Sequence, residues 1–347
     1  MNKRGIALII AFIVIVVLTI FGGAVISRSI SENRVARRYA ESSQAFWLAE
    51  AGINCALREL KLDYAGTYLS SNCTVPSLGQ GRYSVDAPEN VVKGVQTYKK
   101  ITAHGFIPAT GAARVERVIE TLVFKYVTVP DSFYTNAIYC AGDIRSKNNA
   151  YEVTGNVTYG GNISYTEGNI EPNPPLHDAN ITPLALLNFD QIRAISYNQT
   201  IIKNGDTYRN YHNATQLSGP FPETFWYNET AGIPNVVFLE GNLDLSGHTT
   251  VGGFFVVGGE VLYNATISGN VNVKGSIYTP GQFTIDGGGG ALNVDGGVWS
   301  GRGTTLNGGA EMAFNGTYMQ AISDLDIDTD AQIVAWRDTN SSYNLTE

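Results

Sequence analysis

The 347-residue sequence has few charged side chains and very few cysteines and histidines. Charged residues make up 16% of the chain, and the formal net charge of −8 comes with no basic stripe beyond the N-terminal segment. This balance argues against a nucleic acid as partner. The three cysteines lack C-x-x-C spacing, and neither an H-E-x-x-H nor a G-x-S-x-G motif occurs. The sequence therefore predicts no enzyme, no metal and no cofactor.

The three cysteines leave two interpretations open. Cys55 and Cys73 can close a short loop in an oxidising compartment, which leaves Cys140 unpaired. Three buried thiols are the alternative.

Charge is entirely missing from residues 6–27, which are mostly Ile, Val, Leu, Phe and Ala. About 22 helical residues at ~1.5 Å each span the ~30 Å hydrocarbon core of a bilayer. A cleaved secretory signal peptide is the alternative, but this run is longer than an ordinary signal core and continues into more helix. We predict the membrane-spanning half of a stalk helix. The predicted membrane and fibre-packing residues are Leu8, Phe12, Ile15, Leu18, Gly22 and Gly23.

Residues 28–62 continue this helix as an amphipathic half. Apolar residues recur three and four positions apart on one helical face: Phe46, Ala49, Ile53, Ala56 and Leu60. This face is expected to pack on a following sheet. The arginines at residues 34–38 suit anionic headgroups or a partner subunit, or are simply a solvated surface.

Both ends of this helical segment resemble type IV pilin precursors. Met1-Asn-Lys-Arg-Gly5 before an apolar run is similar to the basic leader of prepilins. Ala45-Phe-Trp-Leu-Ala-Glu-Ala-Gly-Ile-Asn54 resembles the A-x-x-A-E-A-G helix end of PilX-type minor pilins. The resemblance implies that a prepilin peptidase cuts between Gly5 and Ile6. It also implies partner pilins or pseudopilins that pack against the helix.

One position departs from the pattern of major pilins. The fifth residue after the expected cut is Ile10, where major pilins carry a glutamate that pairs with a neighbouring subunit. Its absence resembles minor pilins and pseudopilins at a fibre tip. We therefore expect a tip or assembly-initiating subunit.

The arginines beside the apolar run complicate the orientation. Arg28, Arg34 and the pair at residues 37–38 outnumber Lys3 and Arg4, which alone would put the large domain in the cytoplasm on a signal anchor. Long domains translocate largely regardless of flanking charge, and the leader resemblance implies export. The expected location is the bacterial inner membrane, crossed once, with a periplasmic or extracellular head, or a pilus.

The remaining sequence predicts a mainly β protein carried on this long N-terminal helix. Residues 63–128 contain three β-type runs, expected to form a small antiparallel, pilin-like sheet. His104 is interpreted as a strand residue. A Gly-rich pattern follows, in which runs beginning at Gly253, Gly275, Gly297 and Gly316 recur about every 20 residues. This repeat predicts a parallel β-helix-like solenoid with coils at 133–172 and 235–320.

Residues 173–234 lack the repeat and are interpreted as an aromatic-rich insertion between early and late coils. Its candidate ligand-facing aromatics are Tyr208, Tyr211, Trp226 and Tyr227. They suit stacking on the sugar rings of a surface polysaccharide, or cover an open side of the solenoid.

Residues 321–347 are expected to form a cap or tail. They hold alternating acids that share one face of an expected strand: Asp324, Asp326, Asp328 and Asp330. Calcium binding and a negatively charged edge strand are the two interpretations.

Three functions fit these features. The first is a minor pilin or pseudopilin of a type IV pilus or type II secretion-like fibre. The second is a membrane-anchored adhesin or polysaccharide-binding surface protein. The least supported is a β-helix carbohydrate-active enzyme, for which Asp286, Asp295 and Arg302 are the candidate residues. Aspartates at turns are, however, common without catalysis.

Overall fold

The computed structural model describes residues 3–93, 96–147, 151–166, 169–172, 174–259, 262–286 and 292–339, with side chains of the first helix from Phe12 onward. The chain divides into two compact units. Unit 1 comprises Met1–Lys93, Thr97–Val123 and Ile333–Glu347, and unit 2 comprises Gly94–Gln96 and Phe124–Gln332.

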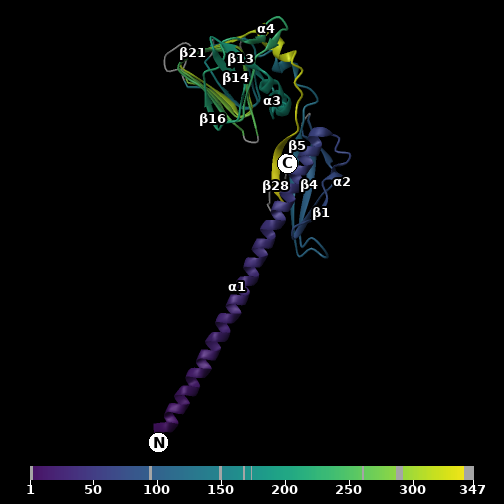
Figure 1. Ribbon diagram of the computed structural model, residues 1–347, viewed down its shortest axis with the longest axis vertical. Helices are drawn as coiled ribbons and strands as arrows, with labels where there is room; N and C mark the ends of the chain where they lie inside the picture. Colours follow the sequence, from purple (N-terminus) through teal and green to yellow (C-terminus); the bar gives the residue numbers. More distant parts are fainter. Residues whose placement is uncertain are drawn as a thin grey trace. The chain divides into compact units, whose positions relative to one another are not determined.

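Unit 1 begins with α1 (Lys3–Leu62), one continuous helix of 60 residues (Figure 1). No proline occurs before Pro76, so nothing removes a backbone donor from the helix. Only the C-terminal part of α1 lies against the sheet of this unit, and the N-terminal part extends away from it (Figure 1). The predicted long N-terminal helix is confirmed.

The sheet of unit 1 is antiparallel wherever its strand pairs are defined, as predicted. Its strands are β1 (Val75–Leu78), β2 (Gly81–Val85), β3 (Glu89–Lys93), β4 (Gln96–Ile107), β5 (Val115–Phe124) and β28 (Gln332–Asp338). They lie in the order β1-β2-β4-β5-β28, with β3 beside β4.

The participation of β28 differs from the expected C-terminal cap or tail at 321–347. Ion pairs fasten this late strand to β5, because Arg117 Nη2 lies 2.7 Å from Asp338 Oδ2 and Arg337 pairs with Glu120. Glu120 also lies 3.1 Å from Lys100 Nζ on β4. These opposite charges help to hold the last strand on a sheet formed mostly from residues 75–124.

The predicted apolar face of α1 packs on this sheet. Ala49, Ile53, Ala56 and Leu60 are buried, whereas Phe46 is only half-buried. Strand and helix approach closely at Gly105 of β4, where an added Cβ would lie 1.9 Å from the carbonyl oxygen of Ala45. Another side chain at Gly105 would thus push the helix off the sheet.

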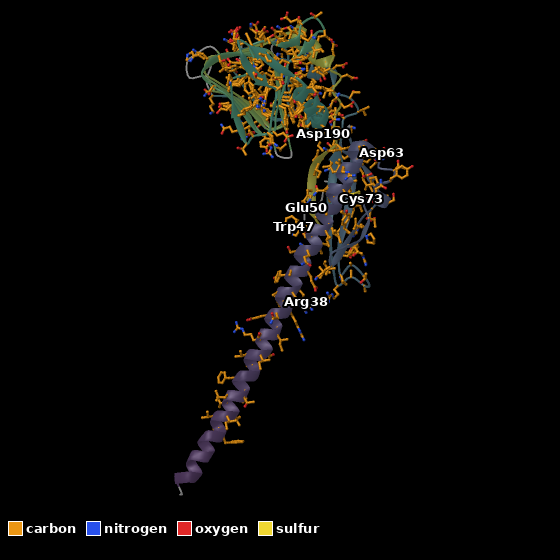
Figure 2. The ribbon with its side chains drawn as sticks, in the orientation of Figure 1. Arg38, Trp47, Glu50, Asp63, Cys73 and Asp190 are labelled. Carbon is orange, nitrogen blue, oxygen red and sulfur yellow. A yellow bond between two sulfur atoms is a disulfide. The ribbon has the colours of Figure 1, made fainter. Side chains whose placement is uncertain are left out.

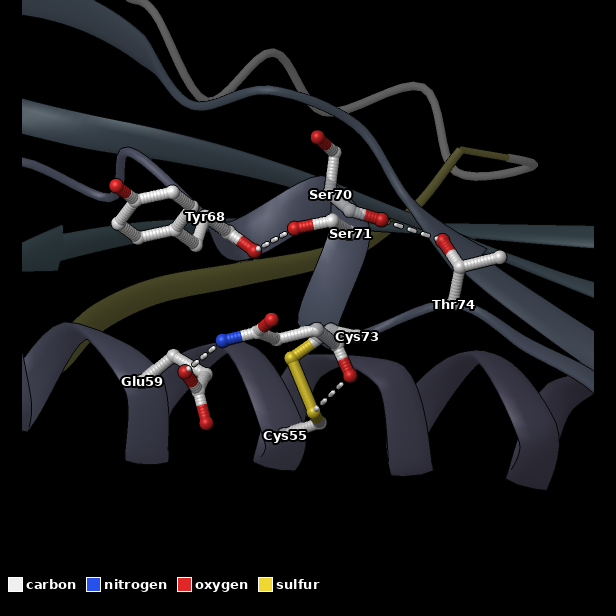
Figure 3. The surroundings of a disulfide bond; sticks show 8 residues. Cys55, Glu59, Tyr68, Ser70, Ser71, Cys73 and Thr74 are labelled. Atoms are coloured by element: carbon white, nitrogen blue, oxygen red, sulfur yellow. Dashed lines mark hydrogen bonds between the residues drawn. A yellow bond between two sulfur atoms is a disulfide. The ribbon is translucent and has the colours of Figure 1, made fainter.

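A disulfide joins Cys55 of α1 to Cys73, which follows the short helix α2 (Leu69–Asn72) (Figure 3). Nearby, Asn72 Nδ2 donates to Glu59 Oε2 at 2.7 Å. Of the two interpretations of the cysteines, the structure contains the disulfide. Cys140 is a free, buried thiol in unit 2.

Unit 2 is a parallel β-solenoid of about eight turns. Two parallel sheets contain its strands: β6 (Ile138–Cys140), β7 (Asp143–Ser146), β8 (Tyr151–Thr154), β9 (Val157–Tyr159), β10 (Ile163–Ser164), β11 (Ile170–Glu171), β12 (Leu176–His177), β15 (Tyr211–His212), β16 (Gln216–Ser218), β19 (Val236–Leu239), β20 (Asn242–Leu245), β21 (His248–Val257), β22 (Ala265–Ser268), β23 (Asn270–Thr279), β24 (Gln282–Asp286), β25 (Leu292–Ser300), β26 (Gly303–Asn307) and β27 (Ala310–Phe314).

The coils do not stack in chain order. Along one sheet the order is β10-β7-β26-β24-β22-β20-β16, so the early strand β7 pairs with the late strand β26. In the other sheet β8 likewise pairs with β27. The chain therefore forms two early coils, crosses to the far end, and returns until its last coil meets the first ones. The prediction of early coils, an insertion and late coils along the chain did not include this stacking order.

Glycines form one corner of each central coil. Gly253, Gly275 and Gly296 are aligned in neighbouring strands and have φ angles of 148°, 129° and 152°. A Cβ at Gly275 would lie 2.1 Å from the carbonyl oxygen of Gly253, and one at Gly296 only 1.7 Å from that of Gly275. The close coil spacing at this corner therefore requires glycine.

Two hydrophobic cores flank the same strands. One fills the solenoid interior and includes Phe255, Ile277 and Val298. The other lies on the outside of the solenoid and includes Phe254, Tyr278 and Trp299. Residues of α3 (Phe189–Asn198), α4 (Gly316–Ser323) and the 3₁₀ helix η1 (Asp131–Phe133) cover this outer core.

Two expected boundaries in unit 2 change. The stretch 173–234 includes β15 and β16, which form the terminal coil, as well as two antiparallel hairpins: β13 (Thr200–Lys203) with β14 (Asp206–Arg209), and β17 (Trp226–Asn228) with β18 (Ile233–Pro234). The expected coil at Gly316 is instead α4. The Asn315 side chain accepts from the backbone N–H groups of Thr317 and Tyr318 and so starts a helix there.

Candidate functional sites

The N-terminal half of α1 is an uncovered apolar surface. Phe12, Ile15 and Leu18 are 66%, 61% and 64% exposed. At Gly22 and Gly23 an added Cβ would meet nothing within 4 Å. The side chain of Leu8, like the predicted cleavage site at Gly5 and Ile6, lies outside the described side chains, although the α1 backbone includes all three.

Within the described residues, α1 is the helix that is long and apolar enough to cross a membrane. Its polar side chain Thr19 donates its hydroxyl to the carbonyl of Ile15 at 2.8 Å, so that group needs no water. Exposing such an apolar surface to water is unfavourable, so lipid or other helices are expected to cover it.

Arginines follow the apolar segment. Arg28 pairs with Glu32 one helical turn later at 2.8 Å, and both side chains are largely exposed. Arg38 projects from the free part of the helix (Figure 2). An exposed ion pair of this kind adds little to the stability of the helix.

An aromatic patch lies where α1 meets the sheet of unit 1. Phe46 packs edge-to-face against Trp47 and against Trp336 of β28, with ring centroids 5.5 and 6.0 Å apart. Trp47 is 62% exposed and Trp336 is 46% exposed. This patch was not predicted from the sequence, because nothing in the spacing of residues 46 and 336 shows that they meet.

His104 lies between two carboxylates on the same sheet. Its Nε2 is 3.1 Å from Asp86 Oδ2 and its Nδ1 is 2.9 Å from Glu116 Oε1. Burial lowers the pKa of the imidazole, but the hydrogen bonds and charges of Glu116 and Asp86 outweigh burial and raise that pKa overall. His104 is a residue of strand β4, as predicted.

The four candidate aromatics do not form one site. Tyr211 stacks on Phe238 with ring centroids 6.2 Å apart and contributes to the cover of the solenoid. Tyr208 lies on the hairpin strand β14, and Tyr227 on β17 is 39% exposed. For Tyr211 the structure thus favours the covering role over the binding one.

Trp226 has a different setting, at the edge of a cleft of about 450 Å³. Its lining residues are Trp226, Gly232, Gly316, Thr317, Gln320, Ala321 and Asp324. One wall comes from the β17–β18 hairpin and the other from α4. The cleft therefore brings a residue predicted from the sequence together with residues that were assigned to a coil and a tail.

The expected strand of alternating aspartates is absent. Asp324 caps the end of α4, and Asp330 is buried. Asp326 and Asp328 line a second cavity, of about 170 Å³, with Asp131. Among the described residues no three acidic, histidine or cysteine side chains are grouped so as to hold a metal ion.

Asp326 also affects a neighbouring tyrosine. Burial and the nearby charge of Asp326 raise the pKa of Tyr134 to about 12. The phenol is therefore neutral at physiological pH.

Of the residues considered for catalysis, Asp295 accepts a hydrogen bond from Asn315 Nδ2 at 3.0 Å, beside the start of α4. The side chain of Asp286 lies outside the described residues. Arg302 lies in the turn between β25 and β26. The hydrogen bond of Asp295 holds the side chain of Asn315, the residue that caps the start of α4.

Comparison with known proteins bears on the helix. Residues 4–54 match the family model described as PilX N-terminal. No curated protein matches the sequence. Among solved structures, an ice binding protein from an Antarctic Biological Consortium is 13% identical, with 55% of this chain and 93% of that chain covered and a TM-score of 0.32. The competence-associated pilin ComZ from Thermus thermophilus is 11% identical, with 86% of this chain and 98% of that chain covered and a TM-score of 0.23.

Both TM-scores are low, so neither structural likeness carries weight here. The family match spans the apolar run and the A-x-x-A-E-A-G helix end, and it confirms the PilX-type resemblance. Residues 4–54 are therefore similar to the N-terminal segment of PilX-type pilins. The rest of the described chain forms an antiparallel sheet and a parallel β-solenoid.

Proposed function

We propose that this protein is a minor, pilin-like structural subunit of a type IV pilus or a type II secretion-like fibre. The observation that carries the proposal is the uncovered apolar half of α1, within the segment that matches the PilX N-terminal model. Lipid covers this surface before assembly, and the helices of other pilins or pseudopilins cover it in the fibre. The role is structural rather than catalytic.

In this proposal a prepilin peptidase removes Met1–Gly5, and the chain crosses the inner membrane once with its head outside the cytoplasm. Ile10 takes the position of the glutamate that major pilins use to pair with a neighbour. A subunit without this charge suits the tip, where no further subunit needs it. The solenoid is then displayed at the end of the fibre or during its initiation.

The test is the intact mass and N-terminal sequence of the protein from cells with and without an active prepilin peptidase. We expect a chain starting at Ile6 only when the peptidase is active. A matched variant, Gly5→Leu, should stay uncut in both cells. A chain that starts at Met1 whether or not the peptidase is active would instead indicate a signal-anchored protein.

Fibre incorporation is tested separately. We expect sheared fibres to contain the processed chain in small amounts relative to the major subunit. Inserting a charge into the packing surface, as in Ile15→Glu, should remove it from fibres, because an unpaired carboxylate is costly in lipid or between apolar helices. Ser43→Glu, on the exposed part of the helix beyond the apolar run, is the control.

A further inference from the structure

We propose that the cleft between α4 and the β17–β18 hairpin binds a segment of neutral polysaccharide. The inference deepens the display role proposed above and rests on it for its biological use. The cleft measures about 450 Å³ and is shallow and open to solvent, which suits one segment of a longer chain lying across it.

The chemistry of the cleft suits a sugar ring. Trp226 supplies an aromatic surface for the apolar C–H face of a pyranose, while Gln320, Asp324 and Thr317 supply polar groups for its hydroxyls. Gly232, Gly316 and Ala321 add no large side chains to the lining. A flat ring with hydroxyls at its edge fits this combination better than a purely apolar ligand does.

Two of these polar groups are hydrogen-bonded to each other without a ligand. Gln320 Nε2 donates to Asp324 Oδ1 at 2.8 Å, one turn apart at the end of α4. The amide oxygen of Gln320 and the second carboxylate oxygen of Asp324 remain as acceptors for hydroxyl donors. Such preorganisation lowers the entropic cost of binding.

The two walls of the cleft are fixed to each other through Phe225. Its ring stacks on Tyr318 of α4, with centroids 4.2 Å apart, and packs edge-to-face against Trp226 at 4.9 Å. Thr224 Oγ1 donates to the carbonyl oxygen of Trp226 at 3.3 Å. Trp226 is half-buried by these contacts and still lines the cleft.

Charge selects the class of polysaccharide. Asp324 contributes a carboxylate to the cleft, and the whole chain carries a net charge of −8. Both disfavour uronic acid or phosphate-bearing polymers. The ligand is therefore a chain of neutral hexopyranoses or N-acetylated sugars.

The experiment is a calorimetric titration of the full chain with neutral hexasaccharides of glucose, mannose, galactose and N-acetylglucosamine. The detergent is a polyoxyethylene ether, because sugar headgroups would compete for the cleft. We expect at least one of the four to bind, and Trp226→Ala to weaken it about tenfold or more. Trp226→Phe should retain part of the affinity. Trp336→Ala, which removes an exposed tryptophan of unit 1, should retain all of it.

Two further variants, Gln320→Ala and Asp324→Asn, each change one polar group of the cleft. Both positions are exposed, so these variants should fold and can test the proposal if Trp226→Ala does not. Each should weaken binding several-fold. The absence of binding to all four sugars, tighter binding of a hexagalacturonate, or unchanged binding by Trp226→Ala would overturn the proposal. A chain that binds sugar but keeps Met1 would contradict the pilin role alone.

Discussion

Among single residues, the glycines aligned at the solenoid corner are constrained both by close contacts and by positive φ angles. Replacing Gly296 by alanine places a Cβ against the backbone of the neighbouring coil and forces a positive φ on a residue that avoids it. We expect Gly296→Ala to lower the free energy of unfolding of the solenoid by about 2 kcal/mol or more. Urea denaturation, with hydrogen exchange to locate the loss in β23 and β25, measures it.

Gly247→Ala is the matched control for this prediction. Gly247 also has a positive φ, of 97°, but an added Cβ there would meet nothing within 4 Å. Its cost should be limited to the backbone strain, about 1 kcal/mol. Equal effects of the two substitutions would show that coil spacing does not constrain Gly296.

His104 makes a pH-dependent contribution to unit 1. Because Glu116 and Asp86 raise its pKa in the folded state, protonated His104 stabilises the sheet. This stabilisation is fully present below the unfolded pKa of about 6.5 and is lost as the pH rises through the raised folded pKa. We expect the opening free energy of β4, measured by hydrogen exchange, to fall across that window.

The pH effect is isolated by comparison with His104→Gln, which keeps hydrogen-bonding groups but does not titrate. The difference in opening free energy between the two proteins should be largest at low pH and shrink as the pH rises. A difference that stays constant with pH would mean that the charge of His104 contributes nothing.

At the scale of elements, the disulfide holds α2 to the stalk helix. Cys55 and Cys73 are 18 residues apart, and closing a loop of that size in the unfolded chain stabilises the folded state by about 3 kcal/mol. Reduction with dithiothreitol should therefore cost unit 1 about that much, first as lost protection of α2 and β1. The reductant has no other disulfide to act on, since Cys140 is a free thiol.

The control for reduction is Cys73→Ala. This variant should already have the lower stability and should not respond to the reductant. If reduction also lowered the protection of solenoid strands β21–β25, the effect would not come from loop closure in unit 1.

Strand β28 depends on charges that it brings to the sheet. Glu120 is almost fully buried, and its hydrogen bonds to Arg337 and Lys100 outweigh burial and lower its pKa. Arg337→Ala leaves this carboxylate with one cationic partner fewer and should cost about 1.5–3 kcal/mol. Hydrogen exchange of β5 measures the loss. Arg114→Ala, which breaks an exposed pair with Glu41, should cost under about 1 kcal/mol.

At the scale of the whole molecule, the helix and the solenoid coils could be predicted from the sequence. Which coil packs against which could not. Length, apolar character and missing charge suffice for α1, and the Gly-rich repeat suffices for a solenoid. The repeat shows that coils stack but cannot show that β7 meets β26, because every coil presents a similar inward row. The expected coil at Gly316 failed since one side chain, Asn315, caps a helix there.

The candidate sites divide in the same way. The exposed residues of α1 follow from local sequence, whereas the Trp226 cleft combines residues about 90 positions apart. The contact of Trp336 with Phe46 joins residues near both ends of the sequence. Such sites depend on how distant parts of the chain come together, and the spacing of apolar residues in the sequence does not predict this.

Because late segments of the chain pair with early ones, both units can be completed only after the C-terminal part of the chain has been synthesised. The early coils lack their neighbour until β26 and β27 arrive, and the sheet on the stalk lacks an edge strand until β28 does. A chain interrupted before these segments leaves open strand edges in both units, which invite proteolysis or aggregation. Incomplete chains would thus be removed, and complete chains would persist.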